Sequence, residues 1–161
     1  MQHVWSPWRF KYVLNAAKDS DCIFCDALKI ENPEESLILY RGIHNFIILN
    51  RYPYNNGHLM IAPYYHLSNP AEAAPEVATE MMLLSQKSLH ALKEVYHPDG
   101  FNLGMNIGRS AGAGIDSHYH MHVVPRWSGD TNFMTSLAET RVIPEDFPST
   151  LQKLKPYFSA E

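Results

Sequence analysis

The apolar residues of the chain fall into short runs that turn-forming residues separate. Runs of four to eight residues that are rich in β-branched and aromatic side chains predict strands. Gly42, Pro53 and the Asn56-Gly57 pair end or separate the first three runs. We therefore expect five strands, over residues 36–42, 45–51, 58–63, 101–108 and 118–125.

One long segment, residues 75–96, has helical periodicity instead. Pro75 suits the first turn of a helix, and the sequence HPDG closes the segment. Shorter helices are expected over residues 21–33, with Asp21 as N-cap and Pro33 as the stop, and over residues 145–157. Together the elements predict an α+β fold around an antiparallel sheet. The apolar stripe of the long helix consists of Val77, Met81, Leu84, Leu92 and Val95.

Length and composition restrict the class of protein. A chain of 161 residues with 45% hydrophobic and 19% charged residues is typical of one globular domain, residues 1–161, with an N-terminal arm (1–20) and a C-terminal tail (135–161). The net charge of −4 argues against a nucleic-acid polymer as partner, although it permits a local phosphate pocket. The apolar runs are too short for a bilayer, and the N-terminus lacks an apolar signal core. We therefore expect a cytoplasmic protein without a membrane partner.

Three of the nine histidines, His118, His120 and His122, occupy alternate positions in the sequence HYHMHVV. Alternate side chains of a strand lie on one face about 6.6 Å apart, so a straight strand cannot bring all three to one metal ion. A row of imidazoles along an extended anion fits this spacing better. The simplest alternative is a polar strand face turned to solvent, but the intervening residues are apolar.

The only cysteines, Cys22 and Cys25, form a C-x-x-C pair. In a reducing compartment such a pair is half of a metal site or a redox centre. A redox pair usually follows a strand, and no apolar strand precedes Cys22. The sequence therefore favours a metal site, with two reduced, buried cysteines as the alternative.

The sequence HYHMHVV resembles the His-φ-His-φ-His-φ-φ motif of the histidine triad (HIT) family of nucleotide hydrolases and transferases. The stretches LNRYPYNNGHLMIAPYYH and MNIGRSAGAG are similar to that family's Gly-His strand and phosphate loop. HVVPRWSGDTNFM and WSPWRFKYV resemble its diadenosine tetraphosphate phosphorylases and fragile-histidine hydrolases. The resemblance implies a single HIT domain, a five-stranded antiparallel sheet with one long helix and short flanking helices, and a homodimer.

The resemblance also implies roles for the histidines. His120 is the expected nucleophile, because a neutral imidazole can attack phosphorus and form a covalent nucleotidyl-histidine intermediate. His122 is expected to contact the α-phosphate, and His58 to hydrogen-bond into the triad. His118 completes the expected catalytic set, but it is not free to donate a proton if it binds a metal.

Further residues are expected to hold the nucleotide. The resemblance implies that Asn50 lies near the ribose and that Asn106 contacts phosphate. Glycine-rich loops let backbone N–H groups approach phosphate oxygens, here from Ser110, Gly112 and Gly114. Beyond these, Arg109 is a possible phosphate contact or a solvated cation. Trp127 is a possible adenine platform, or a residue of the core or dimer interface.

The resemblance implies a structural zinc ion and no organic cofactor. Some histidine triad proteins and the related galactose-1-phosphate uridylyltransferases bind zinc through a C-x-x-C pair and two histidines. The corresponding residues here are Cys22, Cys25, His66 and His118.

The expected function is a nucleotidyl hydrolase or transferase that acts on dinucleoside polyphosphates such as diadenosine tetraphosphate. The sequence does not separate hydrolysis from phosphorolysis. The alternatives are a hydrolase of nucleoside phosphoramidates or AMP esters, a nucleotide-binding module with little turnover, and a metallohydrolase with a catalytic zinc on His118 and His120.

Overall fold

The computed structural model describes residues 22–130, 143 and 145–158. The expected N-terminal arm, Asp21 and most of the expected tail therefore lie outside the described residues. None of the described helices is long and apolar enough to cross a membrane. The helices and strands, in chain order, are α2 (Ile23–Lys29), α3 (Pro33–Ser36), β1 (Ile38–Arg41), β2 (Asn45–Leu49), β3 (Leu59–Pro63), η1 (Pro70–Glu72), α4 (Pro75–Tyr96), β4 (Gly100–Gly104), η2 (Arg109–Ala111), β5 (Met121–Arg126), α6 (Phe147–Leu154) and η3 (Lys155–Tyr157).

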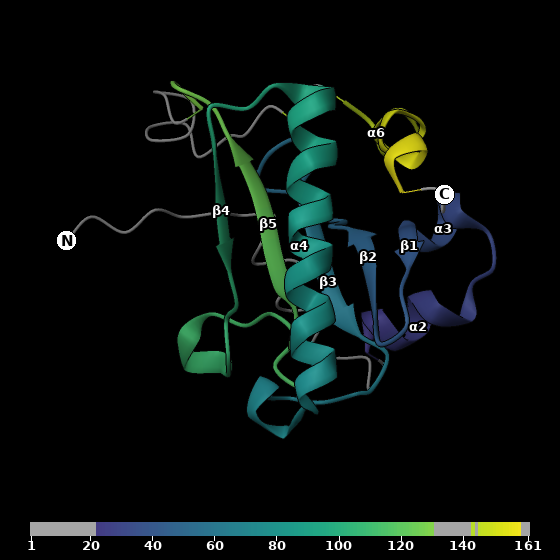
Figure 1. Cartoon of the computed structure of the whole chain (residues 1–161), viewed down its shortest axis with the longest axis vertical. Coiled ribbons are helices and arrows are strands. Elements are labelled where there is room, and N and C mark those ends of the chain that lie inside the picture. Colours follow the sequence, from purple (N-terminus) through teal and green to yellow (C-terminus); the bar gives the residue numbers. More distant parts are fainter. Residues whose placement is uncertain (1–21, 131–142, 144, 159–161) are drawn as a thin grey trace.

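The strands form one sheet in the order β1-β2-β3-β5-β4, and every neighbouring pair is antiparallel. The expected five-stranded antiparallel sheet is confirmed. Strands β2 and β3 are buried along their whole length. Helix α4 crosses the sheet, and α2, α3 and α6 lie near its β1 edge (Figure 1).

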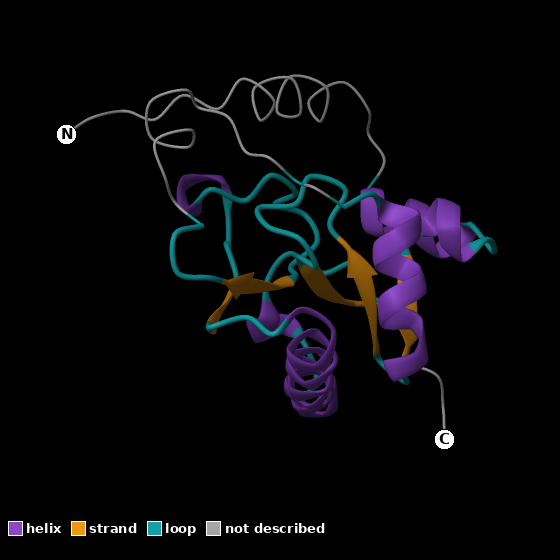
Figure 2. Cartoon of the chain, turned by 90° about the horizontal axis from the view of Figure 1, so that it is seen from above, coloured by secondary structure: helices purple, strands orange, loops and turns teal. Residues whose placement is uncertain are grey.

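Helix α4 has the bounds that the periodicity predicts, Pro75–Tyr96. Its apolar stripe faces the sheet: Val77, Met81, Leu84 and Leu92 are buried and Val95 is partly buried. The Ser85 hydroxyl of α4 lies 3.1 Å from the Met121 sulfur of β5. Because successive side chains of a strand point to opposite faces, the next residue, His122, points away from α4. Figure 2 looks along α4 and shows loops on the other side of the strands.

The expected strand over residues 118–125 is wrong at its first half, since β5 begins at Met121. The Tyr119 N–H donates to the Leu67 carbonyl at 2.7 Å and not to a strand neighbour. The His120 ring bonds to the carbonyl of His118 at 3.0 Å. Such local side-chain bonds compete with the hydrogen bonds of a sheet. The three triad histidines therefore do not share one straight strand face.

Several other boundaries differ from the expectation. The second strand ends at Leu49 and not at residue 51, and α6 spans Phe147–Leu154 within the expected 145–157. Pro33 does not stop the first helix, which ends at Lys29, but begins α3, where its missing N–H costs nothing. The first strand starts at Ile38 because Leu37 ends α3 in the left-handed conformation. The fourth strand ends at Gly104 and not at residue 108.

Glu80 of α4 holds the turn between β1 and β2. Its carboxylate accepts hydrogen bonds from the backbone N–H of Ile43 (2.6 Å), His44 (2.7 Å) and Asn45 (2.7 Å). The side-chain amide of Asn45 adds a fourth, at 2.9 Å. Burial raises the pKa of Glu80, but these hydrogen bonds outweigh burial and leave the pKa below its ordinary value.

Replacing Glu80 by glutamine should lower the free energy of unfolding by about 1.5–3 kcal/mol at neutral pH, the usual range for hydrogen bonds to a charged group. The pKa is lowered in the folded state, so this contribution is complete above the unfolded pKa of about 4.3 and is lost as the pH falls through the folded value. Urea unfolding from pH 7 down to pH 3 should show the gap closing. The exposed Glu76→Gln serves as control. A gap that stays constant with pH would contradict this role.

Candidate functional site

Three histidines gather on the sheet face that points away from α4. His58 lies two residues before Met60, which pairs with His122 across β3 and β5, so both histidines point to the same face. Their ring centroids are 5.1 Å apart, and the His120 ring lies 4.8 Å from that of His122. The structure therefore brings His58, His120 and His122 together.

The His120 ring is buried and has a defined proton arrangement. Its Nδ1 lies 3.0 Å from the carbonyl oxygen of His118. A carbonyl oxygen can only accept, so Nδ1 carries a proton and donates. Burial lowers the pKa of His120 below its ordinary value, with the hydrogen bond to His118 acting in the opposite direction. At neutral pH the ring is therefore uncharged, and Nε2 has a free lone pair.

His58 and His122 form a relay with an equally defined direction. The backbone N–H of Tyr54 donates to Nδ1 of His58 at 3.0 Å, so the proton of His58 is on Nε2. That Nε2 lies 3.0 Å from Nδ1 of His122 and donates to it. A neutral His122 therefore carries its proton on Nε2, from which it can donate to a ligand.

Asn50 and Tyr54 support this relay from the chain after β2. The Asn50 amide nitrogen is 3.3 Å from His58 Nδ1, and its backbone N–H donates to the His58 carbonyl at 3.0 Å. The Tyr54 ring packs on His58 and stacks on His122, at centroid distances of 4.7 and 5.9 Å. Asn50 was expected near the ribose of a bound nucleotide. The hydrogen bond from Tyr54 to His58 was not predicted, because a backbone N–H leaves no signal in the sequence.

His118 has partners other than the triad histidines. Its Nε2 donates to the carbonyl of Pro63 at 2.9 Å, so its Nδ1 has a free lone pair. Burial lowers the pKa of His118 to about 4. Its Nδ1 lies 3.3 Å from the Cys22 sulfur and 3.7 Å from the Cys25 sulfur. His118 is therefore a neutral side chain in a second cluster, with Nδ1 directed at the two cysteines.

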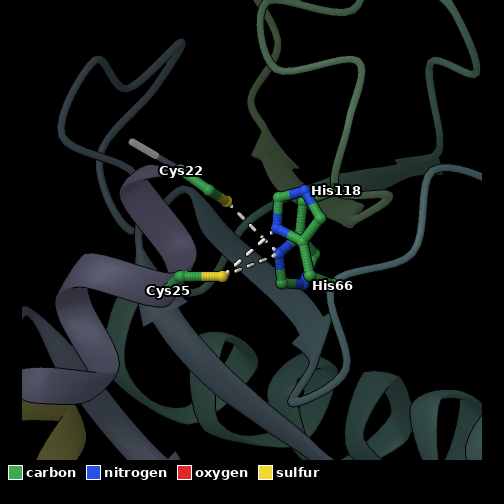
Figure 3. Close-up of side chains that lie close together, drawn as sticks. All are labelled: Cys22, Cys25, His66 and His118. Atoms are coloured by element: carbon green, nitrogen blue, oxygen red, sulfur yellow. Dashed lines mark hydrogen bonds between the residues drawn. The ribbon is translucent and has the colours of Figure 1, made fainter. Parts of the chain in front are cut away.

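That cluster contains the four residues expected to bind metal, Cys22, Cys25, His66 and His118. Their potential ligand atoms all lie within 4.8 Å of one another, and Cys25 is 3.3 Å from His66 Nδ1. In Figure 3 the two cysteines of the α2 segment point toward the rings of His66 and His118. Burial raises the pKa of the Cys22 thiol to about 11, so a metal ion would have to displace its proton.

The cluster fits a four-coordinate zinc ion. Zn–S distances of about 2.3 Å and Zn–N distances of about 2.0 Å in a tetrahedron separate a sulfur from a nitrogen ligand by about 3.5 Å. The sulfur–nitrogen distances here are 3.3, 3.3 and 3.7 Å. The hydrogen bond to Pro63 also fixes the His118 tautomer, as metal-binding histidines require.

Phe24 connects the two clusters, and the sequence analysis missed it. It is a residue of α2, lies between Cys22 and Cys25 in the sequence, and is fully buried. Its ring centroid is 4.7 Å from that of His120 and 5.1 Å from that of His118. An aromatic residue inside a C-x-x-C pair is the only signal in the sequence, and it does not reveal what the ring touches.

The expected phosphate loop is exposed and leads from β4 to His118. Asn106 follows β4 and is partly buried, whereas Ser110, Gly112 and Gly114 are exposed. Gly112 has φ = 88°, a conformation that favours glycine.

Two further residues of interest have partners of their own. Arg109 forms an exposed ion pair with Asp116 at 2.7 Å. Trp127 is partly buried, and its backbone N–H donates to the Asp130 carboxylate at 3.3 Å.

Comparison with known proteins adds independent information. A family model described as HIT domain matches residues 31–129, which include the four histidines of the triad and relay. A protein of Mycobacterium tuberculosis named AP-4-A phosphorylase is 38% identical over 153 residues, which cover 90% of this chain and 78% of that protein.

Solved structures agree with the family match. The Zn-bound histidine triad family protein of Mycobacterium smegmatis has a TM-score of 0.69 and 28% identity, covering 86% of this chain and 93% of that one. A hypothetical histidine triad nucleotide-binding protein of Sulfolobus tokodaii has a TM-score of 0.68 and 26% identity, covering 85% and 91%.

Proposed function

Since this chain belongs to the HIT domain family and is a nucleotide-processing enzyme, we propose that it cleaves diadenosine tetraphosphate and related dinucleoside polyphosphates by phosphorolysis, through a nucleotidyl group bound to His120. The observation that carries the proposal is the His120 tautomer. Its Nδ1–H donates to the His118 carbonyl, so Nε2 offers a lone pair in a buried, neutral ring. The similarity to a protein named AP-4-A phosphorylase supports the substrate class.

In the first step, Nε2 of His120 attacks the α-phosphorus of one adenosyl end. A P–N bond forms, the bond from that phosphorus to the bridging oxygen breaks, and ATP leaves with the electron pair on its terminal oxygen. The positive charge that develops on the ring is stabilised by the hydrogen bond to the His118 carbonyl. His122 donates from Nε2 to an α-phosphate oxygen, and His58 keeps it in that tautomer.

In the second step, an oxygen of inorganic phosphate attacks the same phosphorus. A P–O bond forms, the P–N bond breaks and ADP leaves, so that His120 returns to its neutral form. His118 points to the cysteines and Pro63 and does not protonate the leaving group. ATP leaves as a stable polyphosphate anion, which makes a strong general acid unnecessary.

Product chromatography tests this function. Diadenosine tetraphosphate incubated with the protein should give ATP and ADP in equal amounts, and only when inorganic phosphate is present. AMP and ATP without phosphate would show hydrolysis instead. No product from dinucleotides, but cleavage of a nucleoside phosphoramidate or AMP ester, would favour that alternative. Tight AMP binding without any turnover would favour the binding module.

We further propose that Cys22, Cys25, His66 and His118 hold a structural zinc ion. When bound, the ion would cross-link α2 to the segments before η1 and β5. Four protein ligands leave no open position for substrate, as is usual for structural zinc sites. A metallohydrolase with zinc on His118 and His120 is not supported, because His120 is not among the clustered metal ligands of the described residues.

Replacing His58 by phenylalanine should lower kcat by roughly 10–100-fold, the usual effect of removing a residue that orients a catalytic group. His122 would lose the donor that fixes its tautomer. Phenylalanine keeps a buried aromatic ring but removes the hydrogen bonds to Tyr54 and His122, so the thermal unfolding temperature should fall by a few degrees, and kcat is compared well below it. Steady-state kinetics measure the effect, with exposed His90→Phe as control. An unchanged kcat would exclude the relay.

The expected homodimer remains a proposal. Strand β4 is an edge of the sheet, and Leu103 on it is 41% exposed, which suits pairing with a second copy. Light scattering in solution gives the mass that decides between monomer and dimer.

A further inference from the structure

The helix that carries the cysteines also touches the expected nucleophile. Phe24 lies between Cys22 and Cys25 in the sequence, and its ring centroid is 4.7 Å from that of His120. Phe24 is fully buried, so its position limits the space in which the imidazole can turn. One side of the His120 ring thus packs against a residue of the C-x-x-C segment.

A second connection runs through the backbone of His118. The ring of His118 belongs to the metal cluster, whereas its carbonyl oxygen accepts the Nδ1–H of His120 at 3.0 Å. A metal ion that fixes the position of the His118 ring therefore also restricts the position of the His118 carbonyl. The ring packing and the proton acceptor of His120 therefore both depend on residues that belong to, or lie between, metal ligands.

Besides its packing on the core through Phe24 and Ala27, helix α2 has few interactions that fix it. It has seven residues, its N-cap makes no side-chain hydrogen bond, and Phe24 and Ala27 are its only buried residues. Helices this short are not stable by themselves. Cross-linking Cys22 and Cys25 to two histidines would fix the position of the helix and hence of Phe24.

We propose that the cluster of Cys22, Cys25, His66 and His118 is a positioning device for the nucleophile, with Phe24 as the positioning residue through which metal binding orients the His120 ring. The proposal rests on the proposed function of His120. Metal occupancy and Phe24 then affect the chemical step and not substrate binding. A metal site that only stabilises the fold would leave the His120 ring unchanged as long as the protein is folded.

The test compares Phe24→Leu with Phe158→Leu, both loaded with zinc. Phe158→Leu is the matched control, because Phe158 is buried in the same core but its ring contacts Tyr40 and not a histidine. Phe24→Leu should lower kcat roughly 10–100-fold, as small misplacements of reacting groups do, with KM within about twofold. Phe158→Leu should lose stability but keep kcat.

Nitrogen NMR of labelled histidines gives the readout besides activity. In the zinc-loaded protein, His120 should show the Nδ1–H tautomer alone, whereas Phe24→Leu should show a mixture of tautomers. The nitrogen shifts of the two tautomers differ far more than loss of a neighbouring ring current could move them. Zinc added to metal-stripped protein should restore the single tautomer, but not in Phe24→Leu, where visible absorption of bound Co²⁺ shows that the site still fills.

Three results would overturn the proposal: an unchanged His120 tautomer and kcat in Phe24→Leu, equal losses in Phe158→Leu, or the same tautomer with and without zinc. If the metal-stripped protein unfolds, the comparison of zinc-loaded Phe24→Leu with zinc-loaded Phe158→Leu still tests the proposal. If the wild-type protein does not cleave dinucleotides, the proposed function fails, and the NMR response to zinc alone still tests the positioning.

Discussion

Replacing His120 by alanine should reduce phosphorolysis of diadenosine tetraphosphate by at least about 10⁴-fold, because loss of a nucleophile removes the covalent route altogether. AMP should still bind, since His122 and the relay to His58 remain. Turnover and AMP affinity, measured on the same preparation, separate loss of chemistry from loss of binding.

Trapping the intermediate makes this prediction sharper. Alkaline quenching during turnover of a slow analogue should give a protein adduct with the mass of one nucleotidyl group, located at His120 by peptide mapping without exposure to acid, because acid hydrolyses a P–N bond to histidine. His90→Ala, an exposed change on α4, should keep both turnover and adduct. Substantial turnover by His120→Ala would falsify the covalent mechanism, whatever the substrate.

Replacing Cys25 by serine should release the metal ion and lower the stability of the protein. A ligand present at about 1,000 times its Kd stabilises the folded state by about 4 kcal/mol. In a domain of this size, 1 kcal/mol corresponds to roughly 2–4 °C in Tm, so the unfolding temperature should fall by roughly 10 °C. Serine keeps the size of the side chain but binds zinc far more weakly than a thiolate.

Metal analysis and calorimetry on the same samples measure this effect. The purified wild-type chain should contain one zinc ion, and the variant none. Lys29→Ala, on the exposed side of the same helix, should keep both the ion and the Tm. Because the Cys22 thiol must lose its proton to bind, zinc affinity of the wild-type protein should increase with pH. A metal-free wild-type protein with the same Tm as Cys25→Ser would contradict the site.

Several features of the fold could be predicted because they depend on local pattern. The stripe from Val77 to Val95 predicted α4, since a helix with one buried face must repeat its apolar positions, and Pro75 and the sequence HPDG gave its ends. The alternation of turn residues and apolar runs gave five strands. Strand and helix ends were less accurate. Pro33 suits a helix start as well as a stop, and the choice depended on how α3 packs.

The resemblance grouped Cys22, Cys25, His66 and His118, and the structure brings these four side chains together, but the arrangement of the triad histidines was not predicted. The spacing of His118, His120 and His122 suggested one row along one anion, yet the structure divides them between two clusters. His118 turns to the cysteines because its two nitrogens find Pro63 and Cys22. These contacts join residues 55 and 96 positions apart, and no local pattern encodes them.

By itself the sequence determined which functional side chains are present, namely a C-x-x-C pair, three alternate histidines and the histidine of a Gly-His strand. It also determined one amphipathic helix among short strands. Only the tertiary structure decided the proton on each imidazole, because each tautomer depends on a carbonyl or an N–H that a distant segment or a bend of the chain supplies. It also decided that Phe24 lies against His120. Hydrophobic periodicity is a property of neighbours in the chain, whereas the direction of a hydrogen bond is a property of neighbours in space.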